Sequence, residues 1–309
     1  MTANNPVSDQ AKSIKPVSNK PIIAFIGLGV MGMPMLRHLI AAGYPARAFA
    51  RSPAARATAV GMGARLCDTP ADAAQGAAFI ITNVTATEDV CEVLLGANGV
   101  SGTAASGAIC IDHSTISATA TREMAAQLAL QGICLLDAPV SGGGQGAVAG
   151  TLSVMVGGDA AAFDAAIPLL QCYGKTIVHV GASGAGQVVK ACNQMVQVVN
   201  IQGIAEAMLL ARSQGVDTDK VLQCLSAGMA GSKMLDLMGP KMSQGDFAAG
   251  IQARLHHKDF GLVADLAATA GLDLPNVIAT AGQLDKLIAA GLGFDDTSSL
   301  FKVLQNNKL

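Results

Sequence analysis

Residues 21–32 read PIIAFIGLGVMG, and this stretch decides the fold. Its first six residues form a short apolar run of the kind that makes a central, fully buried strand of a parallel sheet. The rest is G-x-G-x-x-G, in which Gly27 permits a tight turn, Gly29 lets phosphates approach the backbone and Gly32 lets the next helix pack closely. A helix over 33–42, stopped by Gly43, would offer free N–H groups to those phosphates. The stretch therefore predicts a dinucleotide-binding loop made of Gly27, Leu28, Gly29, Val30, Met31 and Gly32.

The residues that follow alternate between strand and helix patterns. Strands are expected at 46–50, 79–83, 108–112 and 133–137, and helices at 87–95 and 117–131. This alternation predicts an α/β domain with a Rossmann-type, doubly wound parallel sheet, whose ligand crevice lies at the carboxyl ends of the strands. Segments 83–85, 113–115 and 139–143 would meet there. Asn83 and Thr115 are candidate cofactor contacts, although a polar cap at a strand end is an equally good interpretation of both.

After one more strand pattern at 176–180, the chain is helical in pattern. A long apolar helix should run to about Ser213, where Gly215 ends it, and further helices are expected at 219–227, 234–242, 255–270 and 274–290. The chain is thus expected to comprise three parts. These are a disordered tail (1–20), a dinucleotide-binding domain (21–183) and an all-helical substrate and oligomerisation domain (184–309) that begins with the long linking helix.

A seam of polar residues marks one face of the long helix, and it comprises Lys190, Asn193, Gln194 and Gln197. Because most of the other positions are apolar, the seam should face something polar, which makes Lys190 a candidate catalytic residue. A lysine that extends from a helix end into solvent is the commoner interpretation of a lone lysine. The consecutive glycines that follow Ser141 offer free N–H groups suited to a carboxylate, although a flexible turn would contain the same residues.

Composition narrows the partners to small molecules. The net charge is −2, with no cluster of Lys or Arg for nucleic acid, and no apolar run reaches the roughly 18 residues of a membrane span. The seven cysteines form no Cys-x-x-Cys pair, which favours free thiols in a reducing compartment. No metal site is expected, because the adjacent His256 and His257 would point to different faces of a helix. The first 20 residues lack a targeting signal, so a cytoplasmic location is expected.

The chain resembles the β-hydroxyacid dehydrogenase family, of the 3-hydroxyisobutyrate dehydrogenase type. The resemblance rests on four motifs in order: FIGLGVMG (25–32), DAPVSGG (137–143), GAGQVVKACNQ (184–194) and LHHKD (255–259). It implies an oxidoreductase that transfers a hydride between a nicotinamide cofactor and a short β-hydroxyacid or semialdehyde. In such an enzyme Lys190 would be catalytic together with Asn193. The resemblance implies that substrate is bound by Ser141, Gly142, Gly143, Asn193 and Gln194, and that Thr115 and Lys258 contact the cofactor.

Within that family, the stretch GMAGS (228–232) and the residues around Lys258 are most similar to tartronate semialdehyde reductases. Reduction of tartronate semialdehyde to glycerate is therefore the expected reaction, with 3-hydroxyisobutyrate and succinic semialdehyde as alternative substrates. A dinucleotide-binding module without catalysis and an imine reductase on the same scaffold are rival interpretations. Both would be marked by loss of the lysine, so the presence of Lys190 counts against them.

The residues at the end of the second strand bear on the choice between NAD(H) and NADP(H). NAD enzymes carry an acid there that bonds the ribose hydroxyls, whereas this chain reads Ala50-Arg51-Ser52. A neutral residue followed by arginine removes repulsion of a 2′-phosphate and supplies a charged fork. NADP(H) is therefore expected to be preferred over NAD(H), with Arg51 and Ser52 as contacts, unless Arg51 is only a solvated surface residue. Apolar surface on residues 188–211 further predicts a homodimer or homotetramer built through the helical domain.

Overall fold

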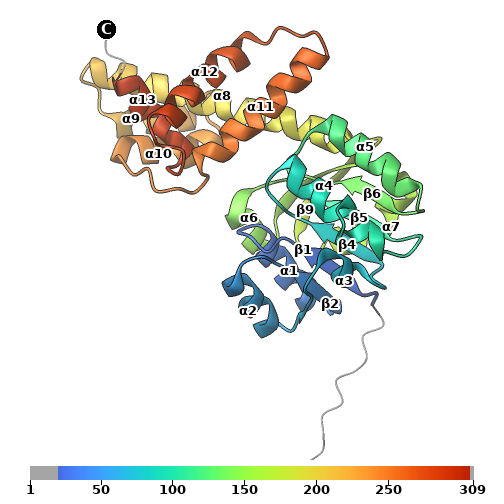
Figure 1. Ribbon diagram of the computed structural model, residues 1–309. Coiled ribbons are helices and arrows are strands. Elements are labelled where there is room, and N and C mark those ends of the chain that lie inside the picture. The colour runs from blue at the N-terminus through green and yellow to red at the C-terminus, as the bar shows by residue number, and fades with distance from the viewer. Residues whose placement is uncertain (1–19, 307–309) are drawn as a thin grey trace, which may run out of the picture.

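The computed structural model describes residues 20–306 of the chain. The predicted disordered tail therefore lies outside the described residues, except for Lys20, whose Nζ donates to the carbonyl of Ala42. A lobe built on a sheet is followed by a helical lobe, and the helix α8 (Ala185–Ser213) runs from one to the other (Figure 1). This arrangement has the fold class that the sequence predicted, with α8 as the linking helix.

Six parallel strands form the main part of the sheet. They are β1 (Ile23–Ile26), β2 (Ala46–Phe49), β3 (Arg65–Leu66), β4 (Phe79–Thr82), β5 (Ile109–Asp112) and β6 (Cys134–Asp137). Their spatial order is β3-β2-β1-β4-β5-β6, which is the order of dinucleotide-binding sheets. The direction of winding reverses between β1 and β4. Ligands bind such sheets at this switch point, outside the carboxyl ends of the strands.

Three further strands make the sheet mixed. They are β7 (Val140–Ser141), β8 (Leu152–Gly157) and β9 (Gly174–Gly181). Strand β8 runs antiparallel to β6 and β7, and β9 pairs with β8 in parallel. Sequence patterns predicted β9 but missed β7 and β8. The predicted parallel sheet is thus confirmed for β1 to β6. It is extended by β8, which runs antiparallel to β6, and by β9.

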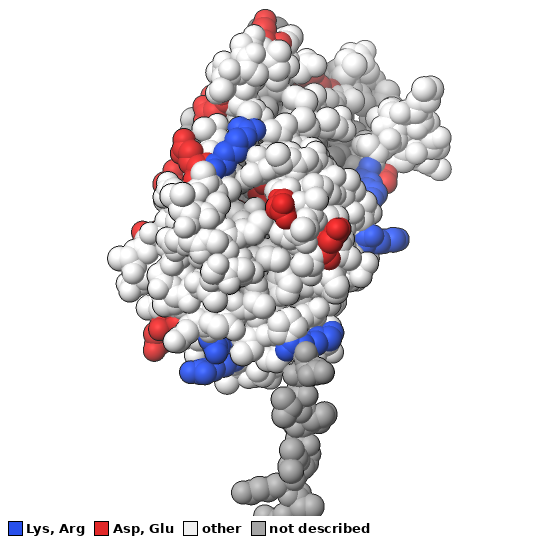
Figure 2. All heavy atoms as spheres, turned by 90° about the vertical axis from the view of Figure 1, so that its right-hand side faces the viewer, with Lys and Arg blue, Asp and Glu red and all other residues white. Residues whose placement is uncertain are grey.

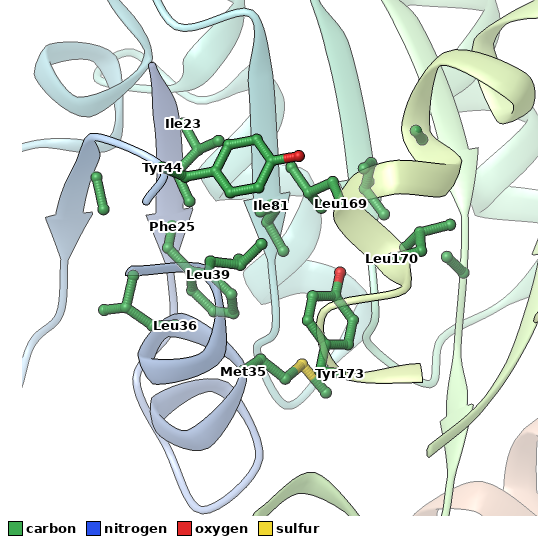
Figure 3. Close-up of a cluster of buried hydrophobic side chains, with 14 of the residues drawn as sticks. Ile23, Phe25, Met35, Leu36, Leu39, Tyr44, Ile81, Leu169, Leu170 and Tyr173 are labelled. Atoms are coloured by element: carbon green, nitrogen blue, oxygen red, sulfur yellow. The ribbon is translucent and has the colours of Figure 1, made fainter. Parts of the chain in front are cut away.

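Helices cover both faces of the sheet. They are α1 (Gly32–Ala41), α2 (Pro53–Gly61), α3 (Pro70–Ala74), α4 (Thr87–Leu95), α5 (Ala118–Ala129), α6 (Gly143–Ala149) and α7 (Ala160–Leu170). Strand β1 shows why: Ile23 and Phe25 enter one apolar cluster, whereas Ala24 and Ile26 enter another, because successive side chains point to opposite faces. In the first cluster, side chains of α1 and of the segment from α7 to Tyr173 converge on β1 (Figure 3).

The helical lobe is assembled around α8. Its other helices are α9 (Thr218–Ala227), α10 (Lys233–Gln244), α11 (Ala253–Thr269), α12 (Pro275–Ala289) and α13 (Leu300–Asn306). Residues Val198, Ile201 and Met208 of α8 are buried in the cluster that joins these helices. At 29 residues, α8 is about 43 Å long, enough to serve both lobes. It ends at Ser213, as predicted, and Gly215 follows with a φ of +71°.

The surface carries charges of both signs. On the face shown in Figure 2, lysines and arginines are scattered among aspartates and glutamates, with no continuous basic field. Within residues 20–306, none of the helices is both long and apolar enough to cross a membrane.

Candidate active site

The glycine loop has the geometry that its sequence predicted. Gly27 has a φ of +96°, and a Cβ at this position would overlap the carbonyl oxygen of Asn83 at the end of β4. A Cβ on Gly32 would overlap the carbonyl of Gly27, so this glycine allows α1 to pack against the loop. A Cβ on Gly29, in contrast, would meet no atom within 4 Å. The backbone at Gly29 is therefore open to a ligand, whereas the positions of Gly27 and Gly32 are filled by neighbouring backbone atoms.

A cavity of about 510 Å³ lies beside this loop at the switch point between β1 and β4. It brings together six of the predicted cofactor residues, Gly27, Leu28, Gly29, Arg51, Ser52 and Asn83. Val30, Met31 and Gly32 do not line it, and neither do Thr115 and Lys258, which lie elsewhere in the site. The open approach at Gly29 and the size of the cavity fit the adenosine and phosphate half of a dinucleotide.

Arg51 lies at the edge of this cavity with an exposed side chain. Its Nη1 is 3.6 Å from Oδ1 of Asp89, near the start of α4. Ser52 is the N-cap residue directly before α2, and its Oγ accepts a hydrogen bond from the amide of Ala55 at 3.5 Å. Asp89 also lines the cavity, together with Glu92. The sequence correctly showed that no acidic residue ends β2. It gave no sign that Asp89, which lies 38 positions after Arg51, approaches the same edge of the cavity from α4.

Lys190 is buried and tethered. Only 7% of its surface is exposed, and its Nζ donates to the carbonyl of Val140 at 2.9 Å and to Oε1 of Gln194 at 2.9 Å. Burial lowers the pKa of Lys190 from 10.5 to about 8, although the nearby Asp259 carboxylate acts in the opposite direction. The side chain is therefore not a surface lysine. At neutral pH it is still mainly an ammonium, but it releases its proton more easily than an ordinary lysine.

A chain of polar contacts continues from Lys190 to the cofactor side. Gln194 Nε2 donates to Asp259 Oδ2 at 2.6 Å, and Asp259 Oδ1 lies 2.8 Å from Lys258 Nζ. Lys258 Nζ in turn donates to the carbonyl of Thr115 at 2.6 Å. The structure thus brings Lys258 of α11 into contact with Thr115 of the sheet lobe, as expected if both serve one ligand. Asp259 belongs to the LHHKD motif but had been given no role, because a buried carboxylate on α11 has no local sequence signal.

The side-chain hydrogen-bond partner of Lys190 is Gln194. Successive residues of an α-helix are rotated by about 100°, so i+4 lies about 40° from residue i and i+3 about 60° away on the other side. Asn193 instead accepts a hydrogen bond on Oδ1 from Gln197 Nε2 at 2.5 Å. All four residues of the polar seam are therefore linked, but Asn193 joins through Gln197.

The predicted substrate-binding turn lies directly beside Lys190. Ser141 follows Val140, whose carbonyl accepts from the lysine, and Gly142 and Gly143 continue into α6. The φ angles of Gly142 and Gly143 are +134° and +61°, so both positions need glycine. The turn therefore begins one residue after the peptide carbonyl that accepts the hydrogen bond from Lys190.

Asp137 and Gln187, which belong to the quoted motifs but were given no role, fix α8 against the sheet. The buried carboxylate of Asp137 accepts from the amides of Gly184 and Gln187 at 2.7 and 2.9 Å. The Gln187 side chain bonds the carbonyl of Ser114 at 2.9 Å and the amide of Ile116 at 3.1 Å. These contacts span about 50 to 70 positions of sequence. They hold Lys190 at a set depth relative to the strand ends.

A second buried carboxylate organises the strand ends. Asp112 accepts from the hydroxyls of Thr82 at 2.7 Å and Ser114 at 2.6 Å, and Ser114 Oγ accepts from the amide of Val84 at 3.0 Å. Burial raises the pKa of Asp112 to about 6, against the effect of these hydrogen bonds. This network joins the segment after β5 to the segment after β4, which borders the cavity.

Together, the fold and the site define an oxidoreductase that binds a nicotinamide dinucleotide. Residues 22–181 match the family model described as the NAD-binding domain of 6-phosphogluconate dehydrogenase. Residues 184–304 match the model described as NAD-binding of NADP-dependent 3-hydroxyisobutyrate dehydrogenase. The chain therefore belongs to the 3-hydroxyisobutyrate dehydrogenase-like family of hydroxyacid dehydrogenases, which confirms the resemblance.

Individual relatives lie within this family. The chain is 38% identical to the 2-hydroxy-3-oxopropionate reductase of Escherichia coli, over 93% of this chain and 99% of that protein. It is also 38% identical to the 3-hydroxyisobutyrate dehydrogenase of Pseudomonas aeruginosa, over 78% and 83% of the two chains. The solved 3-hydroxyisobutyrate dehydrogenase of Mycobacterium tuberculosis with L-serine is similar at a TM-score of 0.84 and 34% identity, with 93% of this chain and 99% of that chain covered.

Proposed function

We propose that this protein is an NADP(H)-preferring reductase that converts tartronate semialdehyde to glycerate, with Lys190 as its general acid. The observation that carries the proposal is the state of Lys190: a buried lysine with a pKa near 8, held between a peptide carbonyl and Gln194. A proton donor works best when its pKa is near the working pH. An ordinary surface lysine would hold its proton too tightly for this task.

When bound, the nicotinamide supplies the hydride that reduces the carbonyl carbon. The residues suited to hold the dinucleotide are those at the cavity, Gly27 to Gly29 with Asn83, and the Thr115–Lys258 pair beyond it. Lys190 itself is buried, and burial strengthens charge interactions at its ammonium.

Lys190 handles the proton at the substrate oxygen. An ammonium has three N–H groups, and two are engaged by Val140 and Gln194, which leaves one for the oxygen. As the carbonyl becomes an alkoxide, this N–H stabilises its charge and transfers the proton. In the oxidative direction the neutral amine accepts the hydroxyl proton. Gln194 keeps the lysine in place because its own amide is fixed by Asp259.

Substrate would be held on both sides of Lys190. The Ser141-Gly142-Gly143 turn is suited to the carboxylate, and charge-assisted hydrogen bonds make such a contact strong. Asn193 and Gln197 add further amides to the same region. A site rich in amides favours a substrate that carries an additional oxygen, as tartronate semialdehyde does, over the methyl group of 3-hydroxyisobutyrate. The E. coli reductase, matched over nearly its whole length, supports this choice.

The cofactor preference is proposed from Arg51. A 2′-phosphate at the edge of the cavity would meet this exposed guanidinium and compete with Asp89 for it. Replacement Arg51→Ala should weaken NADPH binding by about 1.5–3 kcal/mol, because one charge-assisted contact is lost, and should barely change NADH binding. Titration of each reduced cofactor by its fluorescence measures both effects. Arg254→Ala, an exposed arginine of α11, is the control, and equal loss of both cofactors in Arg51→Ala would contradict the assignment.

A panel of short semialdehydes, each assayed with NADPH and NADH, tests the activity itself. We expect the highest kcat/KM for tartronate semialdehyde with NADPH. A higher value for the 3-hydroxyisobutyrate or succinic semialdehyde pairs would reassign the substrate within the family. Turnover of none of these aldehydes would remove the proposal.

A further inference from the structure

Gln197 lies one turn beyond Asn193 on α8, and its side-chain amide contacts both Asn193 and Gln194, the residue that holds Lys190. Its Nε2 donates to Asn193 Oδ1 at 2.5 Å and to Gln194 Oε1 at 3.2 Å. The side chain is partly buried, on the same face of α8 as Lys190. Both hydrogens of the Gln197 amide are thus used within the seam, and neither is spent on solvent.

The orientation of each side-chain amide in this seam follows from two charged groups that contact Gln194, the Asp259 carboxylate and the Lys190 ammonium. The carboxylate of Asp259 can only accept, so the atom of Gln194 that faces it is Nε2. The ammonium of Lys190 can only donate, so the atom of Gln194 that faces it is Oε1. These two requirements agree. Because Oε1 of Gln194 also faces Gln197, the group that Gln197 presents is its NH₂, and the atom of Asn193 that meets this NH₂ is Oδ1.

This order leaves the Nδ2 group of Asn193 pointing away from Gln197. Among the described residues it has no hydrogen-bond partner in the structure, whereas Oδ1 is occupied. A side-chain amide that rotated freely would offer an oxygen or a nitrogen to a ligand with similar ease. Here the oxygen is held, so the ligand meets only N–H donors.

We propose that Gln197 is a positioning residue that fixes the amide of Asn193 so that it presents N–H donors to the substrate. The proposal rests on the proposed function of the site and deepens it. The fixed amide of Asn193 favours substrates that carry an oxygen acceptor beside it, either a carboxylate or a second hydroxyl. A site that holds donors ready rejects an analogue without the acceptor, since these N–H groups then lose their partner.

Two substitutions of similar size separate orientation from packing. Gln197→Glu replaces the donor with an acceptor, so Asn193 has to turn and offer Oδ1 to the substrate. Gln197→Met keeps the volume and leaves Asn193 free to rotate. Gln202→Met is the matched control, because Gln202 is a buried glutamine of the same helix whose amide, among the residues that the structure describes, donates to Glu206 alone.

The direct readout is binding of glycerate to the complex with reduced cofactor, followed by nicotinamide fluorescence, alongside KM and kcat for the aldehyde. We expect Gln197→Glu to weaken glycerate binding and raise KM by at least tenfold, Gln197→Met by about threefold, and Gln202→Met not at all. The introduced carboxylate should also raise the pKa of Lys190 and move the pH profile of kcat/KM to higher pH. A purely structural role would lower the melting temperature and kcat of both Gln197 variants without this order in glycerate affinity.

Failure of this inference is distinguishable from failure of the proposed function. If the wild-type protein reduces a semialdehyde but the Gln197→Glu variant binds glycerate as tightly as wild type, the orienting role is wrong and the function stands. If the wild-type protein neither reduces any semialdehyde nor binds glycerate, the function falls and the inference falls with it.

Discussion

At the scale of single residues, the site depends on how burial and neighbouring charges act on Lys190. Desolvation disfavours the ammonium and is the larger effect, while Asp259 favours the ammonium and opposes it. The result is a pKa of about 8 in place of 10.5. Both protonation states are therefore accessible near neutral pH. Reduction requires the charged form and oxidation requires the neutral one, so the two directions should respond to pH in opposite ways.

The pH dependence of kcat/KM should show this opposition. For aldehyde reduction, kcat/KM should fall as pH rises through about 8, because the ammonium is lost. For glycerate oxidation it should rise through the same value. Asp259→Asn removes the charge that favours the ammonium, so both transitions should move to lower pH. Profiles that stay flat between pH 6 and about 10, or that move to higher pH in Asp259→Asn, would contradict the role of the lysine.

At the scale of elements, the position of α8 determines where Lys190 lies. The amino end of this helix is seated against the sheet by Asp137 and by the absence of a side chain at Gly186. A Cβ at Gly186 would come within 2.5 Å of the carbonyl oxygens of Asp137 and Met155, both of which belong to rigid strands. Neither strand can give way cheaply, so a methyl group there should push the helix outward.

Replacement Gly186→Ala should therefore destabilise the protein by about 1–3 kcal/mol, as expected for overpacking, and lower kcat by displacing Lys190. Gly261→Ala in α11 is the matched control. A Cβ there meets nothing within 4 Å, so the substitution should be neutral or stabilise by about 0.4–1 kcal/mol. Denaturant unfolding of both variants measures the free energy of unfolding. Equal stability of the two would show that α8 is not seated as described.

Local patterns predicted many of the helices and strands, but they did not predict the contacts between them, and they missed β3, β7, β8, α2, α3, α6, α7 and α13. The apolar run at β1, the glycine loop and the stop at Gly215 each act within a few residues, and each was read correctly. Strand β8 was missed because its apolar run carries no sign that the chain returns in the opposite direction. Asp89, Asp137 and Asp259 were given no role because each acts on a residue distant in the chain or across the lobes. The sequence predicted Lys190 as a candidate catalytic residue, but the lowered pKa of Lys190 depends on burial that only the fold supplies.

At the scale of the whole molecule, the helical lobe leaves much apolar surface uncovered. Large apolar side chains exposed there include Val196, Leu210, Val216, Met229, Leu237, Leu272, Ile278 and Phe294. Helix α9 has no buried residue at all. Exposed apolar surface of this kind is typical of protein–protein contacts, and two-fold pairing of identical chains is the commonest way to cover it.

We therefore expect a homo-oligomer built through the helical lobe. Light scattering at micromolar concentration should give at least twice the 31.1 kDa of one chain. Leu210→Glu introduces a charge on this surface and should shift the mass toward the monomer, whereas Lys175→Glu, on an exposed position of β9, should not. A wild-type mass of a single chain would refute the expectation.

In the proposed mechanism the two parts of the molecule have separate tasks: the sheet lobe binds the dinucleotide, and α8 brings Lys190 to the reacting oxygen. Replacement Lys190→Ala tests this separation most directly, by measuring kcat and the dissociation constant for NADPH on the same preparation, with Lys175→Ala as control. We predict that kcat falls by about 10²–10⁴, as for loss of a general acid, while NADPH affinity changes by less than about twofold. A variant that keeps more than about a tenth of wild-type kcat, or that loses NADPH binding along with turnover, would contradict the central claim.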